Sequence, residues 1–224
     1  MAKKRANHDS TIRTLVKGLS QLVGDVEPRS ELGQLQAVFT RAANSIASNP
    51  ELATEKNIDA LARLLNVRAN PAFIETVVAG LFSIAIKTDL SFGASDQIAD
   101  IFIKALEDAD MRRDVELALM NGLMDIVKTN NALAHDAASG LLSFLHDNED
   151  FAFARVAGTH LGALALNTSG TLRVTIEQAL CEASNSEKGA IRVGGEFGLR
   201  VLKSSKLEAL KNLAETLPPS TPSL

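Results

Sequence analysis

Apolar segments of helical character recur along this chain at a nearly constant interval of about 40 residues. Long segments with apolar residues at three- and four-residue spacing begin near residues 30, 70, 110, 150 and 187. Such spacing indicates amphipathic α-helices, and shorter helical segments lie between the long ones. This recurrence is typical of repeated helix pairs, because one pair cannot bury its apolar face alone and buries it against the next pair.

The repeated segments also resemble one another in sequence. AGLFSIAIKT at 79–88 matches NGLMDIVKT at 121–129 with a slip of one residue. The shorter helical segments form a second related set: NIDALARLL from Asn57, DQIADIFIKAL from Asp96 and KLEALKNLAETL from Lys206. We conclude that one helix pair is repeated about five times.

Polar clusters, glycines and prolines divide the chain into about eleven predicted helices. The expected ranges are 10–26, 30–49, 57–67, 70–88, 95–108, 110–129, 132–146, 150–166, 171–183, 187–203 and 206–217. Ser30 and Ser95 are the predicted N-caps of the second and fifth helices. The fourth and sixth helices are apolar on most sides, which predicts that each is sandwiched between neighbours.

Composition supports an all-α fold with one packed domain. Hydrophobic residues make up 46% of the chain, yet there is no Trp or Tyr and only nine Phe. Strands favour aromatic and β-branched residues, so this composition favours helices. We expect a single helical-repeat domain over 10–217, a flexible basic tail at 1–9 and a flexible tail at 218–224.

Charge and cysteine content narrow the classes of partner and compartment. A formal net charge of −4 argues against a surface that binds nucleic-acid phosphates throughout. The basic start, Lys3 to Arg5, has no apolar segment behind it, and no apolar run approaches the roughly 20 residues of a membrane span. A single cysteine, Cys181, fits a reducing compartment, so a cytoplasmic location is predicted.

The period and the helix-pair rhythm resemble the HEAT and armadillo superfamily over about nine-tenths of the chain. The units carry no well-formed proline-and-aspartate pattern, so the resemblance is to the superfamily and not to either subfamily. It implies a right-handed α-solenoid of about five stacked pairs, whose second helices line a concave binding surface and whose terminal helices cap the stack. A globular helical bundle is the alternative fold.

Glycines recur within the predicted second helices, where each costs about 1 kcal/mol relative to Ala. These positions are Gly80, Gly122, Gly158, Gly162, Gly194, Gly195 and Gly198. We expect the missing Cβ atoms to let stacked second helices approach closely. The alternative is that GGEFG at 194–198 brings the backbone close to a ligand.

Charged residues on the second helices are the candidate binding residues. Arg192, Glu196 and Arg200 lie four residues apart, which predicts a ladder of charges on a solvated helix face. Arg112, Arg113, Arg155 and Arg192 would form a basic strip if the period holds. The predicted partner-binding residues are Arg41, Asn44, Glu75, Arg112, Arg113, Arg155, Arg192 and Glu196.

No catalytic or metal-binding constellation stands out in the sequence. His135 and His146 share a predicted helix face but lie about 16 Å apart along its axis, too far to share a metal. Cys181 is predicted to be a buried, inert thiol near Ile176 and Leu180. We therefore expect no catalytic residues, no metal and no cofactor.

Four function classes follow from these observations. The favoured one is a non-enzymatic scaffold that binds another protein or peptide along its second helices, without a membrane partner. The main alternative is a HEAT-like nucleic-acid binding protein or DNA glycosylase-like enzyme, although such proteins need a basic groove and aromatic contacts to a base. A third is a small-molecule or cofactor-handling helical enzyme similar to the HEAT-like lyases that attach bilins, although no cysteine or histidine is placed for that chemistry. A fourth is self-association through the apolar face of the C-terminal helix, at Leu207, Leu210, Ala214 and Leu217.

Overall fold

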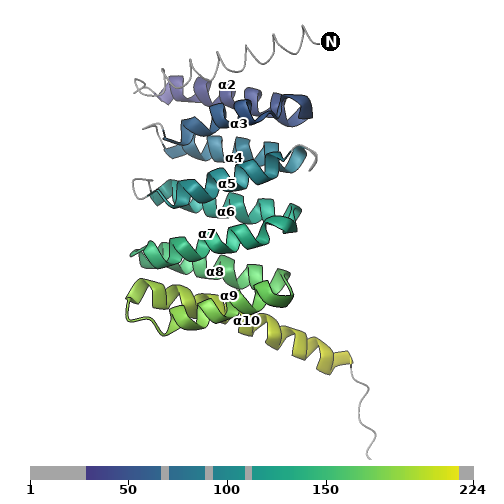
Figure 1. Ribbon diagram of the computed structural model, residues 1–224. Coiled ribbons are helices and arrows are strands. Elements are labelled where there is room, and N and C mark those ends of the chain that lie inside the picture. Colours follow the sequence, from purple (N-terminus) through teal and green to yellow (C-terminus); the bar gives the residue numbers. More distant parts are fainter. Residues whose placement is uncertain (1–28, 67–70, 89–92, 109–112, 217–224) are drawn as a thin grey trace, which may run out of the picture. The chain divides into compact units, whose positions relative to one another are not determined.

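The computed structural model describes residues 29–66, 71–88, 93–108 and 113–216, and Figure 1 shows their path. Within these residues the chain forms nine α-helices and no strand. The chain divides into two compact units, Met1–Gly140 and Leu141–Leu224. The all-α class is therefore confirmed. The predicted helix over 10–26 and both predicted tails lie outside the described residues.

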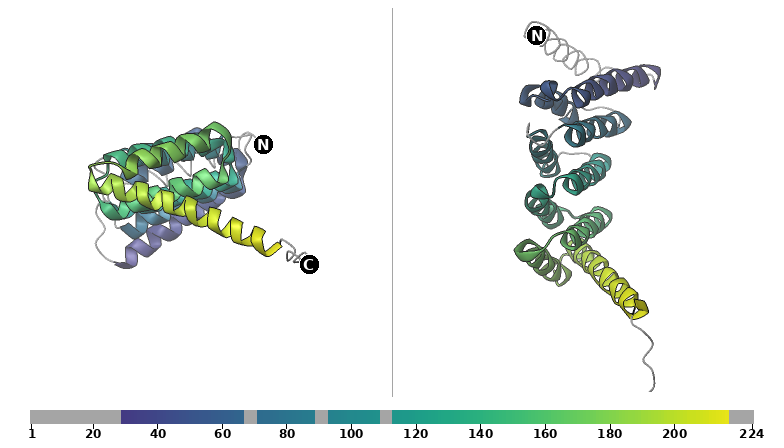
Figure 2. Two further views of the ribbon diagram at one scale, coloured as in Figure 1. Left: turned by 90° about the horizontal axis from the view of Figure 1, so that it is seen from below. Right: turned by 90° about the vertical axis from the view of Figure 1, so that its right-hand side faces the viewer.

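Unit 1 is built from two rows of helices. The first row consists of α2 (Arg29–Ser48), α4 (Pro71–Lys87) and α6 (Arg113–Thr129), and each packs on the next. The second row contains α3 (Glu55–Ala62) and α5 (Ala94–Leu106), which pack on each other and on α4. Short 3-10 helices follow α2 (Pro50–Leu52), α3 (Arg63–Asn66) and α6 (Asn131–Leu133). Figure 2 shows the two rows from the side.

The core of unit 1 lies between its two rows. Helix α4 touches α2, α3, α5 and α6, which confirms that this apolar helix is sandwiched between neighbours. The rings of Phe39 and Phe73 meet edge to face with centroids 6.1 Å apart, and both side chains are fully buried. Burying one such side chain stabilises the fold by about 1.5–3 kcal/mol, so this contact between α2 and α4 helps to hold the helices of the first row together.

Glutamine side chains link successive helices within both rows. In the first row, Gln36 Nε2 of α2 donates to Ala72 O of α4 at 2.9 Å and to Thr76 Oγ1 at 3.1 Å. In the second row, Gln97 Nε2 of α5 donates to Glu55 O at 3.1 Å and to Asp59 Oδ1 at 2.7 Å. Each glutamine reaches the first turns of the neighbouring helix in its row. Polar contacts between neighbouring helices therefore recur in both rows, as the apolar packing does.

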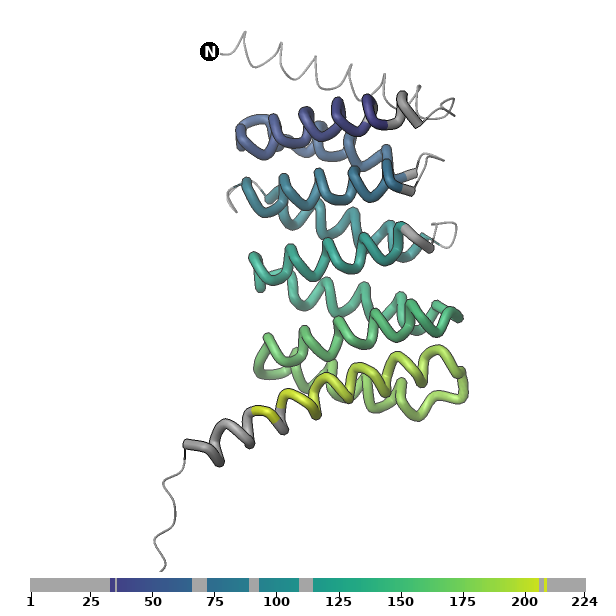
Figure 3. The backbone as a smooth tube through the Cα atoms, turned by 180° about the vertical axis from the view of Figure 1, so that it is seen from behind, coloured from purple at the N-terminus to yellow at the C-terminus, as the bar shows by residue number. Residues whose placement is uncertain are grey.

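Unit 2 contains the end of α7 (Ala134–Asp147), followed by α8 (Phe151–Asn167), α9 (Gly170–Ser184) and α10 (Gly189–Thr216). Helix α10 packs on both α8 and α9. The Asp150 carboxylate caps α8 by accepting from Ala152 N at 2.8 Å. Gly170 begins α9 with φ of 66°, a backbone conformation that favours glycine. Figure 3 shows α8 and α10 side by side.

Two predicted N-cap residues are wrong. Ser30 already lies inside α2. Ser95 is not the N-cap of α5, because Gly93 with φ of 64° takes that position. The Ser95 side chain is instead buried, and its Oγ donates to Ala85 O at 3.0 Å. It therefore joins the end of α4 to the start of α5.

The predicted break between 203 and 206 is also wrong. One continuous helix, α10, spans Gly189–Thr216, so the described helices number fewer than the eleven expected. Ser204 and Ser205 occupy the expected break, but a serine inside a helix costs only about half a kcal/mol and leaves the backbone hydrogen bonds intact. The side chains of Leu207, Leu210 and Ala214 lie outside the described residues.

Candidate functional site

Helices α8 and α10 pack backbone against backbone, because glycines occupy both sides of their contact. Gly158 faces Gly194 and Gly162 faces Gly198, and a Cβ atom at Gly198 would lie 2.7 Å from Gly158 O. Each facing pair is 36 residues apart in the same direction, so the two helices run parallel in one register. The prediction that recurring glycines let second helices approach closely is confirmed here.

The backbone of neighbouring helices packs closely against the GGEFG segment at 194–198. A Cβ atom at Gly194 would lie 2.6 Å from Ala154 O of α8, and one at Gly195 would lie 2.8 Å from Leu180 O of α9. Together with Gly198, all three glycines face other backbone, so the alternative of a ligand at this segment is not supported. In unit 1 the recurring glycines pack against aromatic rings instead, as Gly122 does against Phe102.

This close packing brings charged side chains of α8 and α10 to one half-buried ring. The guanidinium carbon of Arg155 on α8 lies 5.2 Å from the ring centroid of Phe197 on α10. That of Arg200, one helical turn after Phe197, lies 4.7 Å from the same centroid. Both distances fall in the range of cation–π attraction, worth about 0.5–1 kcal/mol at exposed sites. Phe197 therefore orients two arginines that are themselves exposed.

The predicted ladder on α10 is present as a row of exposed residues but without its ion pairs. Arg192 Nη1 donates to Ser186 O at 3.2 Å, and Arg200 lies over Phe197. Within the described part of the chain, the ion pairs between neighbouring turns join other residues: Lys104–Asp100, Lys128–Asp125 and Arg173–Glu177. Arg192 thus contacts the Ser186 carbonyl and Arg200 contacts the Phe197 ring, where the spacing predicted contacts with Glu196.

We call this surface the α8–α10 face and define it by Arg155, Arg192, Glu196, Phe197, Arg200 and Lys203. Arg155 is the only Asp, Glu, Lys or Arg residue in α8. The basic side chains of the face are all exposed, and Glu196 is its one acid. The face therefore carries a net positive charge on a chain whose formal charge is −4.

The other predicted binding residues lie in both units. Arg41 and Asn44 on α2 and Glu75 on α4 are exposed side chains of unit 1. Arg155, Arg192 and Glu196 are exposed in unit 2. Arg113 begins α6 but its side chain is not described, and Arg112 lies outside the described residues. The predicted basic strip is thus described only at Arg155 and Arg192.

Sequence reasoning left Phe197, Arg200 and Lys203 out of the binding set. Arg200 follows Phe197 by three residues, a spacing that places both side chains on one side of a helix. The 36-residue register adds Arg155 to this pair. The spacing was visible in the sequence, whereas the register depends on glycine contacts that only the structure reveals.

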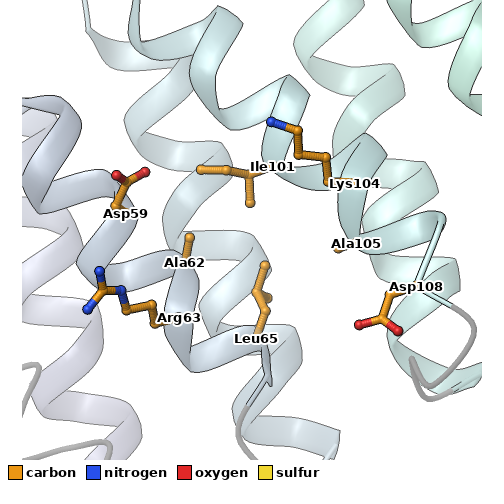
Figure 4. A pocket seen from close by; sticks show the side chains of 8 residues that line it. All are labelled: Asp59, Ala62, Arg63, Leu65, Ile101, Lys104, Ala105 and Asp108. Atoms are coloured by element: carbon orange, nitrogen blue, oxygen red, sulfur yellow. The ribbon is translucent and has the colours of Figure 1, made fainter.

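A second candidate site is an open groove of about 320 Å³ between α3 and α5 in unit 1. Figure 4 shows its charged rim of Asp59, Arg63, Lys104 and Asp108 over a floor of Ala62, Leu65, Ile101 and Ala105. Asp59 already accepts from Gln97. Lys104 Nζ donates to Asp100 Oδ2 at 2.6 Å, and this hydrogen bond raises the pKa of Lys104 above 10.5. The rim is thus largely engaged by the protein itself, and sequence analysis did not predict the groove.

The prediction of a buried thiol at Cys181 is wrong. Cys181 is exposed on α9, whose buried stripe consists of Ile176, Leu180 and Ala183. One residue corresponds to a rotation of about 100° around a helix, which carries Cys181 away from this stripe. Val174, also on α9, has an exposed fraction of 57%. Helix α9 therefore presents both polar and apolar groups on its open side.

The described residues contain no cluster of three or more His, Cys, Asp or Glu side chains placed to hold a metal ion. Among the helices described, none combines the length and apolar character that crossing a membrane would require.

Comparison with known proteins does not assign this chain to a family. No protein-family model matches the sequence, and no curated protein matches it. A solved structure described as a computationally designed self-assembling cyclic homooligomer is similar over 97% of this chain and 98% of its own. The identity is 14% and the TM-score is 0.30.

Proposed function

We propose that this chain is a non-enzymatic scaffold, a right-handed α-solenoid of HEAT or armadillo type that binds another protein along its second helices. The two rows of unit 1 and the parallel register of α8 and α10 in unit 2 support the repeat architecture. The observation that carries the binding proposal is the pair of guanidinium groups held over Phe197 on the exposed α8–α10 face.

Oriented arginines favour protein recognition for two physical reasons. Arginine is enriched at protein interfaces, where its planar group binds carboxylates through two hydrogen bonds. Ordering one long side chain on binding costs about 0.5–1.5 kcal/mol. Stacking on Phe197 restrains Arg155 and Arg200 before a partner arrives, so part of that cost is already met.

The test is affinity capture from the native host followed by mass spectrometry. The wild-type chain is compared with a second-helix variant, Arg41→Glu with Glu75→Lys and Arg155→Glu, whose substitutions all fall on exposed residues. The matched control is Arg63→Glu, an exposed arginine on the rim of the α3–α5 groove. We expect one protein in stoichiometric amount with the wild type and the control, and its loss with the second-helix variant.

Other outcomes of this capture contradict the proposal. Recovery of nucleic acid in place of protein would move the function to the nucleic-acid class. Loss of the partner from the Arg63→Glu control alone would move the binding site to the α3–α5 groove. A partner consisting of a second copy of this chain would make self-association the function. Fractionation of the host checks the predicted cytoplasmic location.

A further inference from the structure

We propose that the α8–α10 face recognises an acidic helix whose charges run acid, base, acid at four-residue spacing. This inference rests on the proposed function, because it names the chemistry of the protein partner at one part of the binding surface. It follows from the order of charges on α10, from the orientation of two arginines by Phe197, and from the absence of acid partners for these arginines among the residues that the structure describes.

The order of charges on α10 is base, acid, base. Arg192, Glu196 and Arg200 are separated by four residues each and are all exposed. Four residues rise about 6 Å along a helix, so the two arginines are about 12 Å apart along the axis with the carboxylate midway. A partner helix lying along α10 with glutamate, lysine and glutamate at the same spacing places an opposite charge at each position.

The arginines of the face form no ion pair within the described structure, so their charges are open to an external partner. In the described structure, Arg155 and Arg200 lie over Phe197 and Arg192 binds a backbone carbonyl, and no acidic side chain forms an ion pair with any of them. Arg173 on α9 shows the contrast, because it pairs with Glu177 at 3.0 Å. Charges already neutralised inside the protein would add little to binding, whereas the α8–α10 face presents its charges without that competition.

The same features disfavour nucleic acid as the occupant. Single-stranded nucleic acid binds through bases that stack on aromatic rings. The ring of Phe197 is half-buried and already has two guanidinium groups against it. Glu196 places a carboxylate between the basic side chains, where it would repel a continuous line of phosphates. An alternating partner turns that carboxylate into a favourable contact.

The probes are synthetic alanine-rich peptides of about 20 residues, long enough to form a helix in water. One carries Glu, Lys and Glu at four-residue spacing, a second carries Lys, Glu and Lys, and a third carries three Glu. A fourth has the charges of the first but central prolines that prevent a helix. Binding of each to the full chain is measured by fluorescence anisotropy at low ionic strength, beside a single-stranded DNA oligonucleotide.

We expect the Glu-Lys-Glu helix to bind about tenfold more tightly than the Lys-Glu-Lys helix, with affinity that falls as salt is added. The double variant Arg155→Glu with Arg200→Glu should lose this preference, and Glu196→Lys should shift it toward the peptide with three Glu. Arg63→Glu and Arg173→Glu should leave it unchanged. Circular dichroism checks that each variant keeps its helices.

Several results would overturn the inference. Tighter binding of the three-Glu peptide to the wild type would show that Glu196 does not select a basic residue at the centre of the partner. Equal binding of the proline-containing peptide would remove the helix requirement, and tighter binding of the oligonucleotide would assign the face to nucleic acid. If no peptide binds while the host partner is still lost from the second-helix variant, the inference fails and the proposed function stands. If the peptides bind as expected but capture yields no protein, the proposed function fails, while the charge preference of the face stands.

Discussion

A Cβ atom at Gly162 of α8 would lie 2.5 Å from the carbonyl oxygen of Gly198 on α10. Real side chains do not approach a backbone oxygen so closely, so even a methyl group requires the two helices to separate. Because this contact sets the register of α8 and α10, it also sets where Arg155 meets Phe197. The function proposed for the face therefore depends on glycines that make no contact with a partner.

Replacing Gly162 with alanine should lower the free energy of unfolding by about 1–3 kcal/mol, the usual cost of overpacking. This loss is expected even though alanine is the better helix former by about 1 kcal/mol. Gly33→Ala is the matched control, because it lies within α2 and a Cβ atom there meets nothing within 4 Å. The control should be neutral or more stable in urea unfolding. Equal stability of the two variants would show that the helices separate without cost.

Replacing Ser95 with alanine should destabilise unit 1 by about 1–3 kcal/mol, because it leaves the buried carbonyl of Ala85 without this donor. Thr175→Ala is the control, since the Thr175 hydroxyl is exposed and donates to Thr171 O of its own helix. The control should change stability by less than about half a kcal/mol. Similar effects of the two substitutions, measured by thermal unfolding, would mean that Ser95 acts as an ordinary surface residue.

The sequence predicted the helices well because their signal is local. Apolar stripes such as Ile98, Phe102 and Leu106 repeat every three or four residues, and all three are buried as expected. The 40-residue period indicated that equivalent helices stack on one another, and the rows of unit 1 do so. Boundaries were less predictable: Ser95 looks like a cap by residue type, but the left-handed Gly93 two residues earlier already begins the helix.

The candidate site was predictable only in part. Exposure of Arg155, Arg192 and Glu196 follows from their position on the polar side of each helix. Stacking of Arg155 on Phe197 depends on the offset between two helices, which varies with each glycine contact and leaves no periodic signal. The α3–α5 groove was hidden for a related reason, because Ile101 and Ala105 fit an apolar stripe but are only half-buried.

The raised pKa of Lys104 predicts a specific pH dependence. The hydrogen bond that Lys104 donates to Asp100 is the largest cause, followed by the negative charge of Asp100, and together they raise the pKa of Lys104 above its ordinary value of 10.5. Since the folded pKa exceeds the unfolded one, the stabilisation is fully present below pH 10.5 and is lost as pH rises through the folded pKa. The stability difference between wild type and Asp100→Asn should therefore shrink in that window. NMR of the Lys104 side chain should show a lower titration midpoint in Asp100→Asn; an unchanged midpoint would contradict this cause.

Cys181 offers the sharpest contrast between sequence and structure, because the apolar neighbours that suggested burial point to the other side of α9. An exposed thiol is accessible to reagents while the protein is folded, whereas a buried one reacts only after unfolding. Ellman's reagent should therefore modify one thiol per chain in native buffer, at a rate that urea raises only slightly. Cys181→Ser should show no reaction, since the sequence contains a single cysteine. A native reaction hundreds of times slower than that of the unfolded chain would mean that α9 is covered in solution, most simply by a second copy packed against its open side.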